Sequence, residues 1–384
     1  MKQIFVKIPF LTNYIHFHYA IQNYKKNLLK FYPAAEKANQ NRLSSLIYSV
    51  YGIIKKGNCH LNTLGSVFPN DTDLASRTSK VKRYLQSKYT DCELLFFPFI
   101  KQIIAGLVSK KEFVLAIDGT DLGKSCGALL VSLVLGKRSL PLVWIVKKGN
   151  KGHFSSEEHI EVLQQVATLL PVSIPVTILG DGEFDSCELQ EFIESKEWNY
   201  VLRTAKNTYI EDKKGDSYKL GELTPFENME YLWLENCAFT KKKYGLVSCL
   251  VWHSPKHKDP IYLVSNLEWA YDMMQYYKQR WAIETLFADI KSRGFNIHKT
   301  RIKKPEMLHN LLIMVAIAFY LCIIIGVAKK EIAKRLPKIF RKDRMHELST
   351  FQIGRGIIDY YQEQNLKINK LFKKALAKYF CVRF

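Results

Sequence analysis

The segment from residue 113 to residue 203 constrains the fold most strongly, because it runs through strand and helix patterns in a fixed order. Three apolar runs of strand length come first, VLAIDGTD, ALLVSLVLG and PLVWIVKKG, separated by turns that contain Gly or Pro. The helix pattern SSEEHIEVLQQVATLL follows, with Ser155 or Ser156 as its expected N-cap. The strand VTILGD, the helix SCELQEFIESKE and the strand NYVLRTA complete the series. These patterns predict a mixed α/β sheet with helices on its faces.

This order is that of an RNase H-like core, and the flanking sequence predicts how the core is embedded in the chain. After the core, Lys-rich turns alternate with short strands such as YLWLENCAF, LVSCLVWH and IYLVSN. A long helix is expected from about Trp269 to Arg293. The expected domains are an N-terminal helical domain over 1–112, the first part of the core over 113–206, a β insertion over 207–268, the second part of the core over 269–328, and a basic helical tail over 329–384.

The positive charge is unevenly distributed along the chain. Residues 1–112 hold 17 Lys and Arg against 6 Asp and Glu, and residues 291–384 hold 21 against 6. The middle, residues 113–290, is acidic, with 19 against 24. Basic surfaces favour polyanions because each neutralised phosphate releases counterions. The charge therefore indicates nucleic acid as the partner, with an anionic membrane surface as the alternative.

Cysteine usage and composition exclude several classes of protein. The 8 cysteines are scattered without a C-x-x-C pair, which excludes a standard zinc ribbon and is typical of a reduced, cytosolic protein. No phosphate-binding G-x-x-x-x-G-K-[ST] motif is present. With 47% hydrophobic and 24% charged residues, the chain is globular rather than disordered.

One uncharged segment, residues 311–328, reaches the length of a short membrane span. The N-terminal residues do not form a secretory signal, because Lys7 interrupts their apolar stretch. Because the chain has no second such segment, we expect 311–328 to be a helix buried in a protein core rather than a membrane helix.

Two helix patterns around the turn FPNDTD lie within the N-terminal domain, and the second carries Arg77, Lys80 and Arg83 on its flank. Two short helices around a tight turn can form a helix-turn-helix-like DNA reader. A plain helical bundle with a solvated basic face fits the same residues equally well.

Two aspartates follow apolar strand runs. Asp118 follows Val114–Ile117, and Asp181 follows Val176–Leu179. Functional groups in open α/β sheets gather at strand ends, and an acid there needs a cation or hydrogen bonds to offset its desolvation. The alternative is a carboxylate that caps the following turn. The neighbouring acids Asp121, Glu183 and Asp185 could also fill the roles assigned to these two aspartates.

The third acid, Glu284, lies on the expected long helix with Tyr277, Arg280 and Lys291. The successive steps of 3, 4 and 7 residues place all four within an arc of about 60° on a straight helix. The alternative is a solvated face with i, i+4 ion pairing. Two strand aspartates and a helix glutamate can instead hold two divalent metal ions, which assist an in-line phosphoryl displacement. Arg280 and Lys291 would then contact phosphates.

Three motifs together resemble a known family. These are D-G-T at Asp118, L-G-D-G-E-F-D around Asp181, and Y-x2-R-x3-E-x6-K from Tyr277 to Lys291. They are similar to the DDE transposases of bacterial insertion sequences, and the last pattern is the mark of the insertion-sequence-four family. The resemblance covers roughly residues 40–330.

The resemblance implies an RNase H-like catalytic core with Asp118, Asp181 and Glu284 as catalytic residues that hold two Mg²⁺ ions, for which Mn²⁺ substitutes. Tyr277, Arg280 and Lys291 would contact the transposon end. It implies cut-and-paste transposition of double-stranded DNA through a hairpin, by a homodimer that synapses terminal inverted repeats and then joins target DNA. A bacterial cytoplasmic, nucleoid-associated location and no membrane partner are expected. A catalytically silent DNA-binding derivative and a nuclease without strand transfer are the alternatives.

For several other side chains the sequence allows more than one role. In some relatives a tryptophan of the β insertion stacks on a flipped base, and Trp233 and Trp252 are candidates, although each could equally be a core residue. Trp281 could also stack or could equally be a core residue, and Arg203 and Lys206 could contact DNA or lie on a solvated surface.

Overall fold

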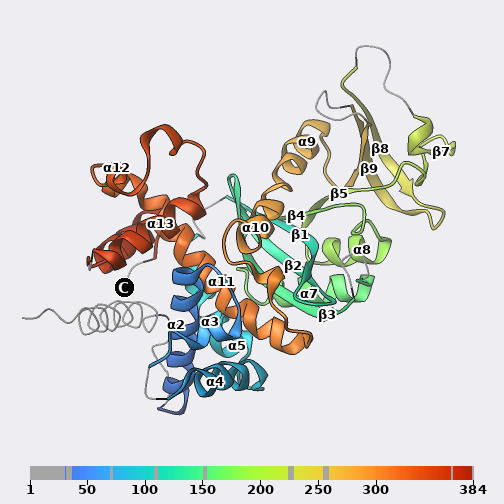
Figure 1. Cartoon of the computed structure of the whole chain (residues 1–384). Coiled ribbons are helices and arrows are strands. Elements are labelled where there is room, and N and C mark those ends of the chain that lie inside the picture. The colour runs from blue at the N-terminus through green and yellow to red at the C-terminus, as the bar shows by residue number, and fades with distance from the viewer. Residues whose placement is uncertain are drawn as a thin grey trace, which may run out of the picture. The chain divides into compact units, whose positions relative to one another are not determined.

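The computed structural model describes residues 31, 37–69, 72–107, 111–149, 154–223, 229–253, 259–364 and 366–382. Contacts divide the chain into two compact units (Figure 1). We call residues 108–121 and 125–287 the sheet unit, and residues 1–107, 122–124 and 288–384 the helical unit. Each unit is described by itself.

The strands form one ten-stranded sheet, in the order β3-β2-β1-β4-β5-β10-β9-β8-β6-β7. At its centre β4 is parallel to both β1 and β5, whereas β2 and β3 are antiparallel. The order of strands and helices along the chain that was predicted for residues 113–203 is confirmed, and so is the RNase H-like fold class. The bounds are β1 (Phe113–Leu122), β2 (Cys126–Leu135), β3 (Arg138–Lys148), β4 (Val176–Gly180), β5 (Asn199–Arg203), β6 (Tyr209–Glu211), β7 (Ser217–Lys219), β8 (Tyr231–Phe239), β9 (Tyr244–Trp252) and β10 (Ile261–Ser265).

Helix α7 (Ser156–Ala167) connects β3 to β4, and α8 (Cys187–Ser195) connects β4 to β5; both pack against the sheet and against each other. Ser155 is the N-cap of α7: its hydroxyl accepts from the Glu158 amide while the Glu158 carboxylate accepts from the Ser155 amide. Ser186 caps α8 in a similar way, by accepting from the Leu189 amide. Both helices therefore begin at fixed residues beside the strands that precede them.

The segment expected to be a β insertion extends the core sheet. Strand β10 pairs antiparallel with β5, and β9, β8, β6 and β7 follow outward from it. The short 3₁₀ helix η2 (Leu220–Glu222) lies between β7 and β8 in the sequence. Helices α9 (Ala270–Gln279) and α10 (Ala282–Ile290) follow β10.

The helical unit is organised around α11 (Pro305–Val327), which is packed by α2, α4, α13 and α14. The helix is long and apolar enough to cross a membrane, yet 94% of its most apolar window is buried within the protein. The expected core helix is thus observed. The other elements of this unit are α2 (Lys37–Lys56), α3 (Leu61–Gly65), α4 (Leu74–Gln86), α5 (Cys92–Leu95), α6 (Phe97–Gly106), η3 (Ile297–Lys299), η4 (Ala328–Ile332), α12 (Leu336–Ile339), η5 (Lys342–Arg344), α13 (Thr350–Glu363) and α14 (Asn369–Tyr379).

The α3–α4 pair corresponds to the two helices expected around the turn FPNDTD. Asp73 caps α4 by accepting from the Ser76 amide at 2.7 Å, whereas Asn70 and Asp71 lie outside the described residues. Helix α4 packs against α2, α3 and α11, and it exposes Lys80 and Arg83. The pair is therefore part of the bundle around α11, and DNA binding by its basic side stays a prediction.

Candidate active site

Asp118 lies within β1, and Asp181 directly follows β4, the parallel neighbour of β1. In the pairing of β1 with β4, Phe113 lies opposite Val176 and Ala116 opposite Leu179. Asp118 and Asp181 each come two residues after the last of these pairs. The end of the apolar run predicts that the strand ends at Asp118. This prediction is wrong, because β1 continues to Leu122. A change from apolar to polar side chains does not interrupt the backbone pairing of a strand.

Arg280 joins Asp118 to Glu284. One guanidinium nitrogen (Nη1) of Arg280 lies 3.4 Å from Asp118 Oδ2, and the other (Nη2) lies 2.5 Å from Glu284 Oε1. The Arg280 and Asp118 side chains are only 14% and 13% exposed. Burial acts to lower the pKa of Arg280, but its neighbours, chiefly the Tyr277 hydroxyl and the two carboxylates, outweigh burial and raise it. The structure thus brings three of the predicted site residues into direct contact.

The expected single helix from Trp269 to Arg293 is wrong, and so is the continuous four-residue stripe placed on it. Helix α9 ends at Gln279, and α10 begins at Ala282. Between them the Arg280 amide donates to the Tyr277 carbonyl at 3.0 Å, and the Ile283 amide donates to the Arg280 carbonyl at 3.2 Å. These three-residue steps form a tighter turn than an α-helix, at the residue that pairs with both carboxylates.

Tyr277 lies beside this cluster. Burial raises the pKa of Tyr277; the positive charges of Arg280 and Arg203 oppose this rise, and the negative charge of Asp181 adds to it. Its ring centroid lies 6.0 Å from the guanidinium carbon of Arg280. Tyr277 therefore lies close to Asp181 and to Arg203, a residue that the sequence left equally divided between DNA contact and solvated surface.

Asp181 is held by the turn that follows β4. Its Oδ1 accepts from the Glu183 amide at 3.0 Å, and its carbonyl accepts from the Phe184 amide at 3.1 Å. Asp185 points elsewhere, since its Oδ2 accepts from the Thr204 hydroxyl at 2.6 Å. Burial raises the pKa of Asp185, and the negative charge of Asp181 adds to this effect.

Lys291 follows the last residue of α10 and belongs to the helical unit. Its predicted contact with DNA stays a prediction. Among the described residues, Lys291 is thus the one signature residue that falls outside the sheet unit.

The three candidate tryptophans differ in accessibility. Trp252 is 4% exposed, and its ring N–H donates to Glu230 at 3.2 Å. Trp233 is half-buried on β8. Trp281 is 64% exposed directly after Arg280. A stacking role for Trp252 would require its exposure, whereas Trp281 is already accessible.

The donor set matches a hard divalent cation, because Asp118, Asp181 and Glu284 offer carboxylate oxygens only. Within the described residues, no group of three or more His, Cys, Asp and Glu side chains is arranged to hold a metal ion. The guanidinium of Arg280 supplies the positive charge between Asp118 and Glu284 instead. The three carboxylates thus fit a metal site in their chemistry.

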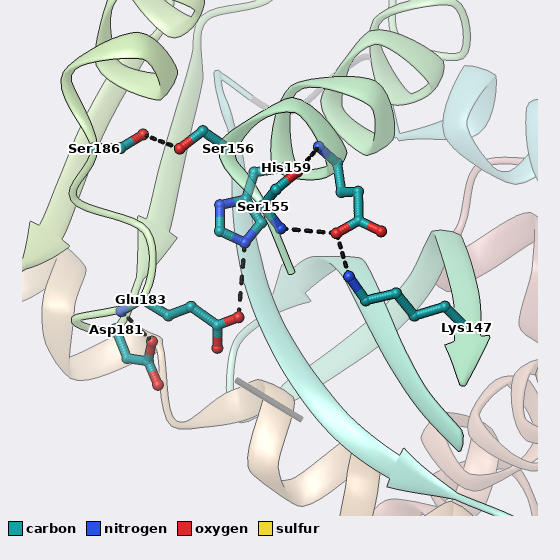
Figure 2. Close-up of polar contacts among 8 residues, drawn as sticks. Lys147, Ser155, Ser156, His159, Asp181, Glu183 and Ser186 are labelled. Carbon is teal, nitrogen blue, oxygen red and sulfur yellow. Dashed lines mark hydrogen bonds and ion pairs between the residues drawn. The ribbon is translucent and has the colours of Figure 1, made fainter. Parts of the chain in front are cut away.

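Sequence reasoning missed His159 on α7, which lies beside the turn that carries Asp181 (Figure 2). His159 is a single histidine within a helix pattern, and no neighbouring residue in the sequence marks it as functional. Its Nε2 lies 3.7 Å from Glu183 Oε1, a contact between residues 24 positions apart that local sequence does not indicate.

Comparison with known proteins supports one family. Residues 111–321, more than half of the chain, match the family model described as a transposase DDE domain. No curated protein shows significant similarity to the chain. Among solved structures, a piggyBac transposase synaptic complex with hairpin DNA is 11% identical, with a TM-score of 0.43, over 96% of this chain and 80% of that one.

A second solved structure is a point variant of Ciona intestinalis endonuclease V in complex with a 23mer DNA that contains an inosine followed by a ribo-adenosine. It is 13% identical, with a TM-score of 0.27, over 58% of this chain and 98% of that one. The endonuclease V of the same organism with a 24mer DNA is 16% identical, with a TM-score of 0.27, over 61% and 89%.

Proposed function

Because the chain belongs to the DDE transposase family, we propose that it cuts and joins DNA at the ends of an insertion sequence. The observation that carries this proposal is the contact of Arg280 with both Asp118 and Glu284. The third predicted acid, Asp181, directly follows β4, the parallel neighbour of the strand that carries Asp118. We assign these three carboxylates as the catalytic residues.

Asp118, Asp181 and Glu284 would hold two Mg²⁺ ions, with Mn²⁺ as a substitute. The bound metals would stabilise the attacking and leaving oxygens of an in-line phosphoryl displacement. Arg280 would then exchange its carboxylate partners for a DNA phosphate, with which guanidinium forms charge-assisted hydrogen bonds. This exchange would free both carboxylates at the moment when the substrate arrives.

The reaction follows a cut-and-paste route in this proposal. A water oxygen attacks the phosphorus at the element's end, and the 3′-oxygen leaves as a 3′-OH. That hydroxyl then attacks the opposite strand, which closes a hairpin and releases the flanking DNA. Water opens the hairpin, and the 3′-OH attacks a phosphorus of the target DNA. In each step an oxygen from water or from a 3′-OH forms a bond to phosphorus, and a 3′-oxygen leaves it.

Tyr277, Arg280 and Lys291 would contact the terminal inverted repeats, which is the pattern of the insertion-sequence-four family. Arg203, exposed at the end of β5, is a further candidate for this set. The working form would be a homodimer that synapses two ends of double-stranded DNA. The location would be the bacterial cytoplasm, at the nucleoid.

The test is a cleavage assay on DNA that carries the native flanks of the gene, with Mg²⁺ or Mn²⁺. The Glu284→Gln change should abolish cleavage, by at least about 10³-fold, while end binding persists, because only a carboxylate is lost. Asp272→Asn on α9 is the matched control, because it makes the same chemical change at an exposed position.

Hairpin ends followed by joined product, absent in Glu284→Gln, would support the proposal. Normal cutting by Glu284→Gln would overturn the assignment of the three carboxylates. End binding by the wild-type chain without cutting would identify a catalytically silent DNA-binding derivative. Cutting without joined product would identify a nuclease.

A further inference from the structure

His159 is a buried polar side chain that the proposed chemistry leaves unused. It lies on α7 with 2% of its surface exposed, and its ring packs at 4.6 Å between centroids against Phe184. Neither ring nitrogen makes a hydrogen bond with the described part of the chain. A buried polar group without a partner destabilises a fold, so such a group calls for an explanation.

The ring of His159 faces a carboxylate: Glu183 Oε1 lies 3.7 Å from Nε2 (Figure 2). This oxygen is itself buried and makes no hydrogen bond with the described residues. The two unsatisfied groups therefore face each other, and a small approach would satisfy both of them.

Glu183 connects this pair to Asp181. Its backbone amide donates to Asp181 Oδ1 at 3.0 Å, while its side chain points to His159. Figure 2 shows the two contacts in sequence, from the helix to the turn and from the turn to the aspartate. Glu183 thus contacts Asp181 through its backbone amide and faces His159 through its side chain.

The N-terminal turn of α7 is itself firmly fixed. Glu158 accepts both the Ser155 amide and the ammonium of Lys147 on β3. The Ser156 hydroxyl donates to the Ser186 hydroxyl at 2.9 Å, which ties α7 to the N-cap of α8. His159 therefore projects from a support that is anchored both to the sheet and to the end of the Asp181 turn.

We propose that His159 is a positioning residue for Asp181, which acts through Glu183 by fixing the turn that presents the Asp181 carboxylate. The proposal rests on the metal-binding role proposed above for Asp181. Groups that orient a metal ligand from behind commonly change metal affinity about 10- to 100-fold when they are removed.

The test compares His159→Gln with His159→Met. The two new side chains have nearly the same length and volume, but only Gln carries an N–H that can donate to Glu183. Loss of packing against Phe184 affects both variants alike, whereas loss of the polar contact affects His159→Met alone. Thermal melting of each variant establishes that both are folded.

The first measurement is amide hydrogen exchange in residues 181–184 of the metal-free full chain. The Glu183 amide should exchange about tenfold faster in His159→Met than in the wild type, and within about twofold of it in His159→Gln. The second measurement is the Mn²⁺ concentration that gives half-maximal DNA cleavage. It should rise about tenfold in His159→Met, with little change in the rate at saturating Mn²⁺.

Equal exchange rates in the two variants would overturn the positioning role and leave His159 as a packing residue. Should neither variant fold, Glu183→Gln carries the test, since an amide oxygen is a weaker acceptor for His159 and the exchange rate should again rise. Asp181→Asn separates the two proposals. If Asp181→Asn cleaves with the Mn²⁺ dependence of the wild type, the metal role of Asp181 is overturned. If Asp181→Asn loses cleavage while His159→Met keeps the Mn²⁺ dependence of the wild type, only the positioning role of His159 is overturned.

Discussion

Asp118 and Asp181 follow similar apolar runs and are each followed by Gly, yet their surroundings differ. Asp118 lies inside β1 and meets the guanidinium of Arg280, 162 residues later in the chain. Asp181 lies beyond the end of β4 and is held by an amide two residues away. The Asp118 carboxylate therefore contacts a cation that is distant in the sequence, whereas the Asp181 carboxylate is held by the turn in which it lies. The difference shows that equal sequence motifs do not imply equal support.

Among the contacts of the two aspartates, the largest effect on cleavage should come from removing the guanidinium of Arg280. Arg280→Ala should reduce cleavage on the order of 100-fold, the usual loss when one donor to a developing charge is removed. It should also lower the free energy of unfolding by about 1–3 kcal/mol, because Asp118 and Glu284 lose their shared partner. Cleavage assays and chemical denaturation measure the two effects.

Lys278→Ala is the matched control, since it removes a positive charge two residues earlier, from an exposed position on α9. It should leave both quantities within a small factor of the wild type. Normal cleavage and normal end complexes in Arg280→Ala would remove Arg280 from the site and, with it, the contrast between the two aspartates.

A smaller effect is expected at the support of Asp181. In Gly180→Ala the added Cβ would lie 2.7 Å from the Phe184 Cβ and 3.0 Å from a Leu202 methyl group. Overpacking of this kind destabilises by about 1–3 kcal/mol, so thermal melting should show a Tm several degrees lower.

Gly182→Ala is the control within the same turn, because the nearest atom to its added Cβ is the Arg203 carbonyl oxygen at 3.9 Å. It should melt close to the wild type. Equal melting temperatures for the two variants would show that close packing at the end of β4 does not hold the turn.

The smallest effect concerns pH. Burial raises the pKa of Asp185 above its ordinary value of 3.8, so the folded state keeps the proton longer than the unfolded state. The contribution of Asp185 to stability is thus fully present below the unfolded pKa and is lost as pH rises through the folded pKa. The wild type should therefore lose stability relative to Asp185→Asn as pH increases from about 4 to 7.

Denaturant unfolding of both proteins across this range measures the difference, in which the other carboxylates cancel. A difference that is constant with pH would show that Asp185 titrates alike in the folded and unfolded chains. In that case the turn after β4 would not be as buried at Asp185 as the geometry indicates.

Local pattern was sufficient to predict the order of strands and helices from β1 to β5 and the burial of α11, and it narrowed the N-cap of α7 to Ser155 or Ser156, of which Ser155 is observed. Each of these depends on neighbouring side chains or on the hydrophobicity of one segment. The contacts of Arg280 with Asp118 and of His159 with Glu183 join distant segments, and only the tertiary fold creates them. The tighter turn at Arg280 was missed for the same reason, since helical periodicity does not register a change in backbone hydrogen bonding.

The continuity of the sheet across β5 and β10 has a consequence for trimming the chain. Excising residues 207–268 to obtain a minimal core would strip β5 of its antiparallel neighbour. An uncovered strand edge recruits strands from other molecules, so the shortened protein would tend to self-associate. The inserted segment thus also serves as a protective cover for the parallel strands, independently of any part that it takes in binding DNA.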